Sequence, residues 1–138
     1  MSFFPPDMPR PFPQFDDAGF WKHCALQQLR FQVCADCNTP RHPPTPVCPC
    51  CHSFHVDWKA TQGHGTVYTY TIIHHASREA VKPNLPYAVG VIEFADVPGV
   101  RLVSNITNID PAQVRIGMPV HLWWDDIGEG MWIPRFSP

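Results

Sequence analysis

The sequence has no long apolar run, few charged residues and no excess of basic charge. No stretch is long and apolar enough to span a bilayer. We also expect no secretory signal, because a positively charged start and an apolar run are both missing from the opening MSFFPPDMPRPFP. The net charge of −2 provides no electrostatic footprint for nucleic acid. We therefore predict a protein of the reducing cytoplasm, where clustered cysteines are more often metal ligands than disulfides.

Motifs of common catalytic centres are missing as well. The chain has no Ser–His–Asp order, no phosphate-cradling glycine loop, no dinucleotide-binding fingerprint and no internal repeat. Proline, by contrast, is abundant, with 17 in 138 residues. At more than twice its usual share of about 5%, proline excludes long helices and favours strands, turns and extended arms. The 44% apolar content supplies a core for one compact unit, or for two small ones sharing an interface.

Four of the six cysteines form two pairs, Cys34-x-x-Cys37 and Cys48-x-x-Cys51, with ten residues between the pairs. This spacing at the tip of a tight turn aims two sulfurs the same way, so two facing turns converge on one point. Zinc prefers four tetrahedral ligands, and thiolate suits it well. We therefore predict one structural zinc ion held by these four residues. A catalytic zinc is disfavoured, because four thiolates leave no position open for water.

Three further residues near the cysteine pairs have other interpretations. Cys50 and His52 lie beside the second pair, so either could replace one thiolate as a ligand, although we favour the four paired cysteines. Cys24 falls on the apolar stripe of an expected helix. We interpret Cys24 as a packing residue and not as a nucleophile.

The first 60 residues divide into an arm and a zinc-held unit. Residues 1–15 alternate proline with aromatics and are expected to form an extended arm that wraps either the parent domain or a partner. Residues 16–60 are expected to form a helix capped by Asp16 and Asp17, followed by a zinc ribbon. This unit is too small to bury a core, and a structural zinc, worth about 10–16 kcal/mol of apparent folding energy at neutral pH, would replace it. The expected elements are a helix from 16 to about 28 and strands over 29–34 and 54–58.

Residues 61–138 have the pattern of a small barrel. Residues 66–73 are almost wholly β-branched or aromatic, which strongly favours a strand. A one-turn helix is expected from Asp110-Pro111 to Gly117, because proline at the first position and glycine beyond the end fit helix termini. Five short strands with a helical turn before the fourth predict a mainly β fold, a closed five-stranded OB-fold barrel. The other expected strands cover 87–94, 100–107, 120–125 and 131–133.

Several motifs occur in one collinear order along the chain. They are a helix with Phe20-Trp21, two cysteine pairs around a proline-rich link, the run Gly63-x-Gly-Thr-Val-Tyr-Thr-Tyr-Thr71, Pro86-Tyr87-Ala88-Val89, Gly99–Asn105, Ile116–Val120 and Pro134-Arg135-Phe136. In this combination the chain resembles the family of small acyl-CoA-associated proteins that join a rubredoxin-like zinc ribbon to an OB-fold. The resemblance covers roughly residues 15–138. The chain departs from it at Asn38 and His52, where glycine is usual, but both residues can adopt a left-handed turn.

The resemblance implies a partner that carries the chemistry. Members of this family are typically partners of thiolase-like enzymes, whose larger subunit holds the nucleophile or acid/base residues. The implied reaction is retro-aldol cleavage of a side-chain acyl-CoA, as in steroid degradation, or acyl transfer or thiolysis. We thus expect a noncatalytic accessory subunit of a hetero-oligomer, with acyl-CoA at or near the interface, the barrel on a thiolase dimer and the ribbon and arm over the CoA. Alternatives are a nucleic-acid-binding module and a partner of an acyl-CoA hydratase.

A loop after the strongest predicted strand contains candidate ligand-binding residues. His74, His75, Arg78 and Lys82 follow that strand at the rim of the expected barrel. Cations on such a loop could meet the phosphates of coenzyme A. A solvated polar loop is the simpler interpretation, and a second metal site at the two histidines lacks a third ligand nearby in sequence.

The acidic and aromatic residues near the end of the chain also need an interpretation. Asp125, Asp126 and Glu129 could be taken for paired catalytic carboxylates, but their turn-like setting predicts a solvated loop. Trp123 and Trp124 are expected to face opposite sides of a strand, so one fills the barrel and the other faces the ribbon, the arm or a partner.

Overall fold

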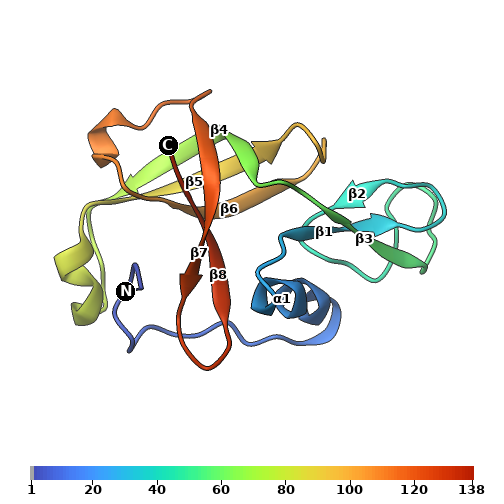
Figure 1. Cartoon of the computed structure of the whole chain (residues 1–138), viewed down its shortest axis with the longest axis horizontal. Helices are drawn as coiled ribbons and strands as arrows, with labels where there is room; N and C mark the ends of the chain where they lie inside the picture. Colours follow the sequence, from blue (N-terminus) through green and yellow to red (C-terminus); the bar gives the residue numbers. More distant parts are fainter. Residues whose placement is uncertain (1) are drawn as a thin grey trace.

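A computed structural model describes residues 2–138 and contains two sheets. One is a three-stranded sheet in the order β2-β1-β3, and the other is a closed barrel in the order β4-β5-β6-β8-β7. Figure 1 shows the two sheets at opposite ends of an elongated molecule, with α1 beside the smaller one. The predicted fold, a helix and zinc ribbon followed by a five-stranded OB-fold barrel, is confirmed. The elements are η1 (Phe15–Asp17), α1 (Ala18–Ala25), β1 (Arg30–Cys34), β2 (Pro40–Arg41), β3 (Val56–Ala60), β4 (His64–Ile73), η2 (Glu79–Asn84), β5 (Tyr87–Phe94), β6 (Arg101–Ile106), η3 (Pro111–Gln113), β7 (Pro119–Asp126) and β8 (Trp132–Ser137).

The helix before the ribbon is shorter than the sequence predicts. It ends at Ala25 and not near residue 28, because Gln27 takes a left-handed backbone conformation with φ of 55°. The backbone N–H of Gln27 donates to the carbonyl of Cys24 at 2.9 Å, which closes the last turn. The strand expected over 54–58 lies two residues further on, at Val56–Ala60, where it pairs antiparallel with β1.

The barrel closes through two short contacts between distant strands. β4 pairs with β5 along most of its length but meets β7 at only three residue pairs. β6 meets β8 in parallel at Ile106 and Phe136. The third strand thus contacts the fifth and the first contacts the fourth, which is the connectivity expected of an OB-fold. Within residues 2–138 no helix is long and apolar enough to cross a membrane.

The ribbon and the barrel share one hydrophobic core. Phe31 of β1 lies 5.3 Å from Phe94 of β5, measured between ring centroids, and Phe94 lies 5.8 Å from Phe136 of β8. All three side chains are at most 2% exposed. The ribbon was expected to lack a core of its own, and it packs instead against the core of the barrel. A change that destabilises one part is therefore expected to destabilise the other.

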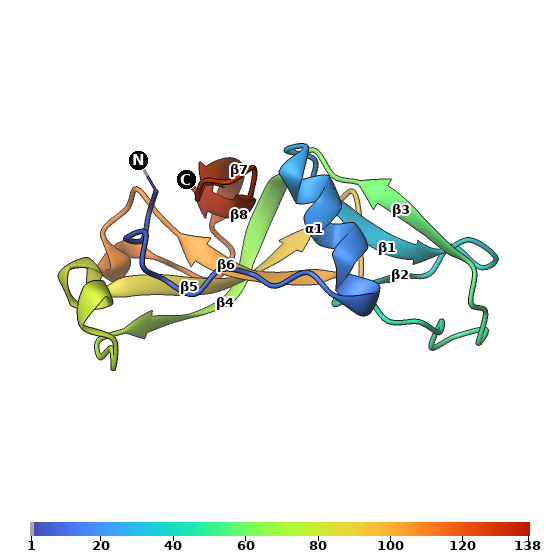
Figure 2. The same ribbon diagram turned by 90° about the horizontal axis from the view of Figure 1, so that it is seen from below.

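The N-terminal arm lies against its own barrel. The backbone N–H of Phe3 donates to Asp125 Oδ2 at 3.2 Å, and Asn84 Nδ2 donates to the Phe3 carbonyl at 2.9 Å. Further along, Arg10 donates to the carbonyls of Ile127 and Gly128 at 2.5 and 2.6 Å. Figure 2, seen from below, shows the arm crossing in front of the barrel strands toward α1. The sequence left two alternatives for the arm, wrapping the parent domain or wrapping a partner. Along this stretch the arm wraps the parent domain.

Candidate metal centre and neighbouring sites

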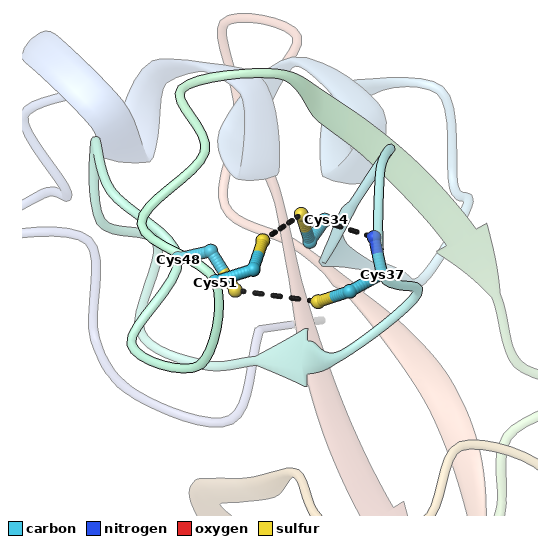
Figure 3. A group of neighbouring side chains, drawn as sticks. All are labelled: Cys34, Cys37, Cys48 and Cys51. Atoms are coloured by element: carbon cyan, nitrogen blue, oxygen red, sulfur yellow. Dashed lines mark hydrogen bonds between the residues drawn. The ribbon is translucent and has the colours of Figure 1, made fainter.

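The four paired cysteines converge at the end of the ribbon (Figure 3). Their sulfur atoms all lie within 4.8 Å of one another. Cys34 and Cys51 approach to 3.5 Å and Cys37 and Cys48 to 3.6 Å, sulfur to sulfur. A tetrahedral zinc with bonds of about 2.3 Å holds its sulfurs about 3.8 Å apart. The four cysteines are therefore positioned to bind one zinc ion, and this ion would be structural because no coordination position is left for substrate.

Two equivalent turns position the sulfurs. The N–H of Asn38 donates to the carbonyl of Cys34 at 2.9 Å, and the N–H of His52 donates to the carbonyl of Cys48 at 3.0 Å. Asn38 and His52 adopt φ of 63° and 62°, the left-handed region that glycine occupies most readily. Both turns therefore form without glycine, as the sequence analysis expected.

Backbone N–H groups in these turns stabilise thiolate, the form that binds zinc. The N–H of Cys37 lies 3.5 Å from the Cys34 sulfur and lowers the pKa of that thiol. The N–H of Cys51, helped by that of Cys50, lowers the pKa of Cys48 to about 6. The N–H of Ser53 acts to lower the pKa of the Cys51 thiol. The contacts of that thiol with Cys34 and the other two thiols outweigh this effect and raise the Cys51 pKa to about 12. A divalent cation would relieve this crowding of negative charge.

A polar cluster outside the four sulfurs ties the two turns together. Asp36, between the first two cysteines, accepts a hydrogen bond from the Ser53 hydroxyl and lies 2.9 Å from His55 Nδ1. The Ser53 hydrogen bond, followed by that of His55, lowers the pKa of Asp36. The Ser53 hydroxyl accepts the backbone N–H of His55 at 3.0 Å, but it donates to the aspartate and not to the His55 ring. The cluster therefore does not have the order of a catalytic triad. Sequence reasoning missed this cluster, although Ser53 and His55 follow the second pair directly.

The remaining cysteines lie outside the four-sulfur group. Cys50 is exposed. Cys24 is fully buried in the core that α1 covers, and burial raises the pKa of its thiol to about 12. A neutral, inaccessible thiol is a poor nucleophile, which agrees with the predicted packing role of Cys24.

Asp125 does not belong to a solvated loop, so the prediction for this residue was wrong. Its side chain is only 1% exposed and lies beside Arg135, which is 5% exposed. Arg135 Nε donates to Asp125 Oδ2 at 2.5 Å, and Arg135 Nη1 donates to Asn105 Oδ1 at 2.5 Å. Strand β7 extends through Asp126, and alternation places Asp125 on the face opposite the core residues Val120 and Trp124. On that face Arg135 and the start of the arm contact Asp125, whereas Asp126 and, in the loop, Glu129 are exposed.

This buried network also holds the start of the arm. Asp125 Oδ2 accepts hydrogen bonds from the Ser2 hydroxyl at 3.3 Å and from the Phe3 N–H at 3.2 Å. The Arg135 guanidinium lies 5.3 and 5.2 Å from the ring centroids of Phe3 and Phe4. Such cation–π contacts favour an arm docked over the ion pair.

The two neighbouring tryptophans are both half-buried. Trp124 packs against the hydrophobic core, whereas Trp123 donates its indole N–H to Thr107 Oγ1 at 2.8 Å. The two tryptophans were expected to face opposite sides of the strand. Trp124 makes the apolar contact on one face and Trp123 makes the polar contact on the other.

A cavity of about 980 Å³ lies between the arm, η2 and the β7–β8 hairpin. Its walls are mainly apolar or proline side chains, and the arm segment 2–11 forms one side. The predicted CoA-binding residues His74, His75, Arg78 and Lys82 are all exposed on the segment that leads into η2 or lies within it. Lys82 is paired with Glu79 at 2.5 Å. Ala80, Pro83 and Asn84 of η2 line the cavity, so Lys82 lies in the same element as part of the cavity wall and Arg78 directly precedes that element.

The fold and the cysteine cluster define a protein in which a structural zinc ribbon is joined to an OB-fold barrel. The chain matches the family described as "ChsH2, rubredoxin-like zinc ribbon domain" over residues 21–57 and "ChsH2, C-terminal OB-fold domain" over residues 58–125. It is 31% identical to a "DUF35 domain-containing scaffold protein" of Methanocaldococcus jannaschii, over 72% of this chain and 70% of that protein. The chain therefore belongs to the DUF35 family and carries the ChsH2 pair of domains, which confirms the resemblance seen in the motifs.

One solved relative is similar over nearly its full length. The chain of the structure named "Ltp2-ChsH2(DUF35) aldolase" is 39% identical and superposes with a TM-score of 0.85, covering 94% of this chain and 98% of that one. Relatives of known sequence include the "Probable enoyl-CoA hydratase alpha subunit" of Thermomonospora curvata, 42% identical over 94% of this chain. The "3-oxo-4,17-pregnadiene-20-carboxyl-CoA hydratase alpha subunit" of Mycobacterium tuberculosis is 34% identical over 88%. The chain spans 40% and 38% of the lengths of these two subunits.

Proposed function

We propose that this protein is the accessory zinc-binding subunit of a thiolase-like acyl-CoA enzyme of the cytoplasm. The reaction that fits best is retro-aldol cleavage of a side-chain acyl-CoA of the steroid type, with acyl transfer or thiolysis as the variants. The observation that carries the proposal is the superposition on the chain of the Ltp2-ChsH2(DUF35) aldolase, with a TM-score of 0.85 and 98% of that chain covered. A zinc ion closed by four thiolates, and a Cys24 thiol that burial keeps protonated, support a noncatalytic role.

The exposed aromatics of the arm are proposed to contact the partner. Phe12 is 79% exposed and Phe15 is 89% exposed, although Phe3 and Arg10 of the same arm are hydrogen-bonded to the barrel unit. Phe15 also has a φ of 50°, an uncommon conformation for a residue that is not glycine. Exposed aromatics are enriched where protein interfaces form, and strained backbone is often found at functional positions.

The loop and cavity around η2 are proposed to receive acyl-CoA at the partner interface. Arg78 and Lys82 would meet the phosphates, with His74 and His75 beside them. The cavity of about 980 Å³ would take apolar parts of the ligand, because its walls offer chiefly apolar surface. Lys82 belongs to the element that lines part of the cavity and Arg78 is the residue before it, which supports a single ligand site.

Replacing Arg78 and Lys82 together by alanine is expected to weaken acyl-CoA binding by the assembled complex about tenfold for each phosphate hydrogen bond that is removed, since a hydrogen bond to a charged group contributes about 1.5–3 kcal/mol. The matched control replaces Lys22 and Lys59, two exposed lysines elsewhere, and removes the same charge. Titration calorimetry with coenzyme A measures both. Equal weakening in the two double variants would mean that only net charge matters and would remove the loop from the proposal.

A nucleic-acid-binding role is not favoured by the barrel's cations. Arg101 is paired with Glu93 at 3.1 Å and lies 3.7 Å from the centroid of the Tyr68 ring. Arg135 is buried with Asp125. Recognition of single strands needs a cationic groove beside stacking aromatics, and these arginines are already engaged.

A hydratase is the second candidate partner. The observation that favours it is the 42% identity to part of the "Probable enoyl-CoA hydratase alpha subunit" of Thermomonospora curvata. The same domain pair thus occurs within a protein named for hydration. The identity of the stable partner separates the two candidates.

We expect the chain to co-elute with a thiolase-like subunit when the two are co-expressed and separated by gel filtration. The Phe12→Ser, Phe15→Ser double variant is expected to weaken this complex at least tenfold, because buried aromatic anchors contribute about 2 kcal/mol or more each. The matched control is Leu26→Ser, Phe54→Ser, which removes two apolar side chains that are 62% and 74% exposed elsewhere.

Three results would count against this assignment. Stable assembly with a hydratase and not with a thiolase-like subunit would favour the second candidate. Equal loss of binding in both double variants would remove the arm from the interface. Binding of single-stranded DNA that weakens with salt would revive the nucleic-acid role.

A further inference from the structure

Two histidines 57 positions apart meet at the seam that closes the barrel. His64 begins β4 and lies directly opposite His121 of β7 in the antiparallel register. Their Nδ1 atoms are 2.9 Å apart. The ring centroids are 5.0 Å apart and the ring planes are nearly perpendicular, at 88°. Both residues are exposed, so water has access to the pair.

This arrangement brings two nitrogen ligands within reach of one cation. Neutral imidazole is a common ligand of Zn²⁺, Cu²⁺ and Ni²⁺. With metal–nitrogen bonds of about 2.1 Å, a nitrogen–nitrogen distance of 2.9 Å corresponds to an angle of about 90° at the metal. An angle near 90° suits octahedral or square-planar ions, whereas a tetrahedral ion such as zinc would need the nitrogens about 3.4 Å apart.

We propose that His64 and His121 form a bidentate site for one divalent transition-metal ion of the Ni²⁺ or Cu²⁺ class, with water in the other positions. The site is separate from the four cysteines, which belong to the ribbon and offer soft sulfur ligands. Binding displaces the proton that one ring otherwise donates to the other. The β4–β7 contact consists of three residue pairs, and the ion would cross-link it at one end.

The proposal is tested by titrating zinc-loaded protein with NiCl₂ in a calorimeter. Ni²⁺ is the suitable probe because Cu²⁺ oxidises thiols. We expect one Ni²⁺ per chain, with the zinc content of the protein unchanged by elemental analysis. His64→Ala and His121→Ala are each expected to weaken Ni²⁺ binding by about 100-fold or more, since even loss of a residue that only supports a ligand costs 10–100-fold. The matched controls His74→Ala and His75→Ala are expected to bind Ni²⁺ as the unaltered protein does.

A second measurement does not depend on the variants' stability. Paramagnetic Ni²⁺ is expected to broaden the ring signals of His64 and His121 in the NMR spectrum of the unaltered protein before those of His74 and His75. The proposal is overturned if no heat is released, if Ni²⁺ displaces zinc from the ribbon, or if the control variants lose binding instead. In each of these cases His64 and His121 are joined by a hydrogen bond and do not form a metal site.

Discussion

Replacing Cys48 by serine is expected to remove zinc from the protein and to unfold the ribbon. Cys48 is fully buried, its backbone carbonyl closes the second turn, and its sulfur lies 3.6 Å from that of Cys37. A structural zinc contributes about 10–16 kcal/mol of apparent folding energy in small zinc-held units. Phe31 packs the ribbon against Phe94 of the barrel. We therefore expect the loss of zinc to lower the melting temperature of the whole chain.

Elemental analysis and thermal unfolding followed by circular dichroism measure this effect. The matched control is Cys50→Ser, which changes an exposed neighbouring cysteine and is expected to leave zinc content and melting temperature unchanged. Full zinc in the Cys48 variant together with loss of zinc from the Cys50 variant would show that the ligand set is wrong.

The second large effect is expected from Asp125→Ala. This change leaves the Arg135 cation buried, at 5% exposure, with Asn105 as its remaining side-chain partner. It also removes the acceptor that holds the Ser2 hydroxyl and the Phe3 N–H. Breaking a buried ion pair by removing one partner costs about 3–5 kcal/mol, so we expect the free energy of unfolding to fall by that amount.

Urea unfolding measures the change, with Glu129→Ala as the control. Glu129 has an 86% exposed side chain and is expected to change the free energy of unfolding by less than about 0.5 kcal/mol. Replacing both members of the pair, as Asp125→Leu with Arg135→Met, is expected to recover much of the loss because no buried charge remains. A single Asp125 variant as stable as the control would contradict the network described here.

The parts of the fold that were predictable depend on short-range patterns. Cys34, Cys37, Cys48 and Cys51 identify the metal centre, because two residues between paired cysteines dictate the turn and zinc dictates the number of ligands. The run of β-branched and aromatic residues after Gly65 identifies β4 in the same way. The left-handed turns at Asn38 and His52 follow from their place after each pair.

The parts that sequence reasoning missed depend on contacts between distant segments. Asp125 looks like a loop residue beside Gly128 and Gly130, and its burial becomes evident only when Arg135 is placed on the neighbouring strand. The arm is bound by residues 81 or more positions away. Its local pattern of prolines and aromatics therefore could not decide whether it contacts the parent domain or a partner. His64 and His121 meet because the barrel closes, which no local spacing indicates.

The end of the first helix was missed for a different reason. The apolar stripe of residues 20–25 continues to favour helix, but Gln27 takes a left-handed backbone conformation, which few non-glycine residues adopt. Its side chain gives no signal for this choice. A left-handed residue at a helix end lets the following N–H groups bond the last carbonyls, here those of Cys24 and His23.

Turnover of acyl-CoA tests the proposed accessory role most directly. The measurement compares the purified zinc-loaded chain, a thiolase-like subunit and the two together, with a side-chain acyl-CoA of the steroid type as substrate. The account predicts cleavage by the pair, little by the thiolase-like subunit alone and none by the chain alone. Robust turnover by the isolated chain would contradict it.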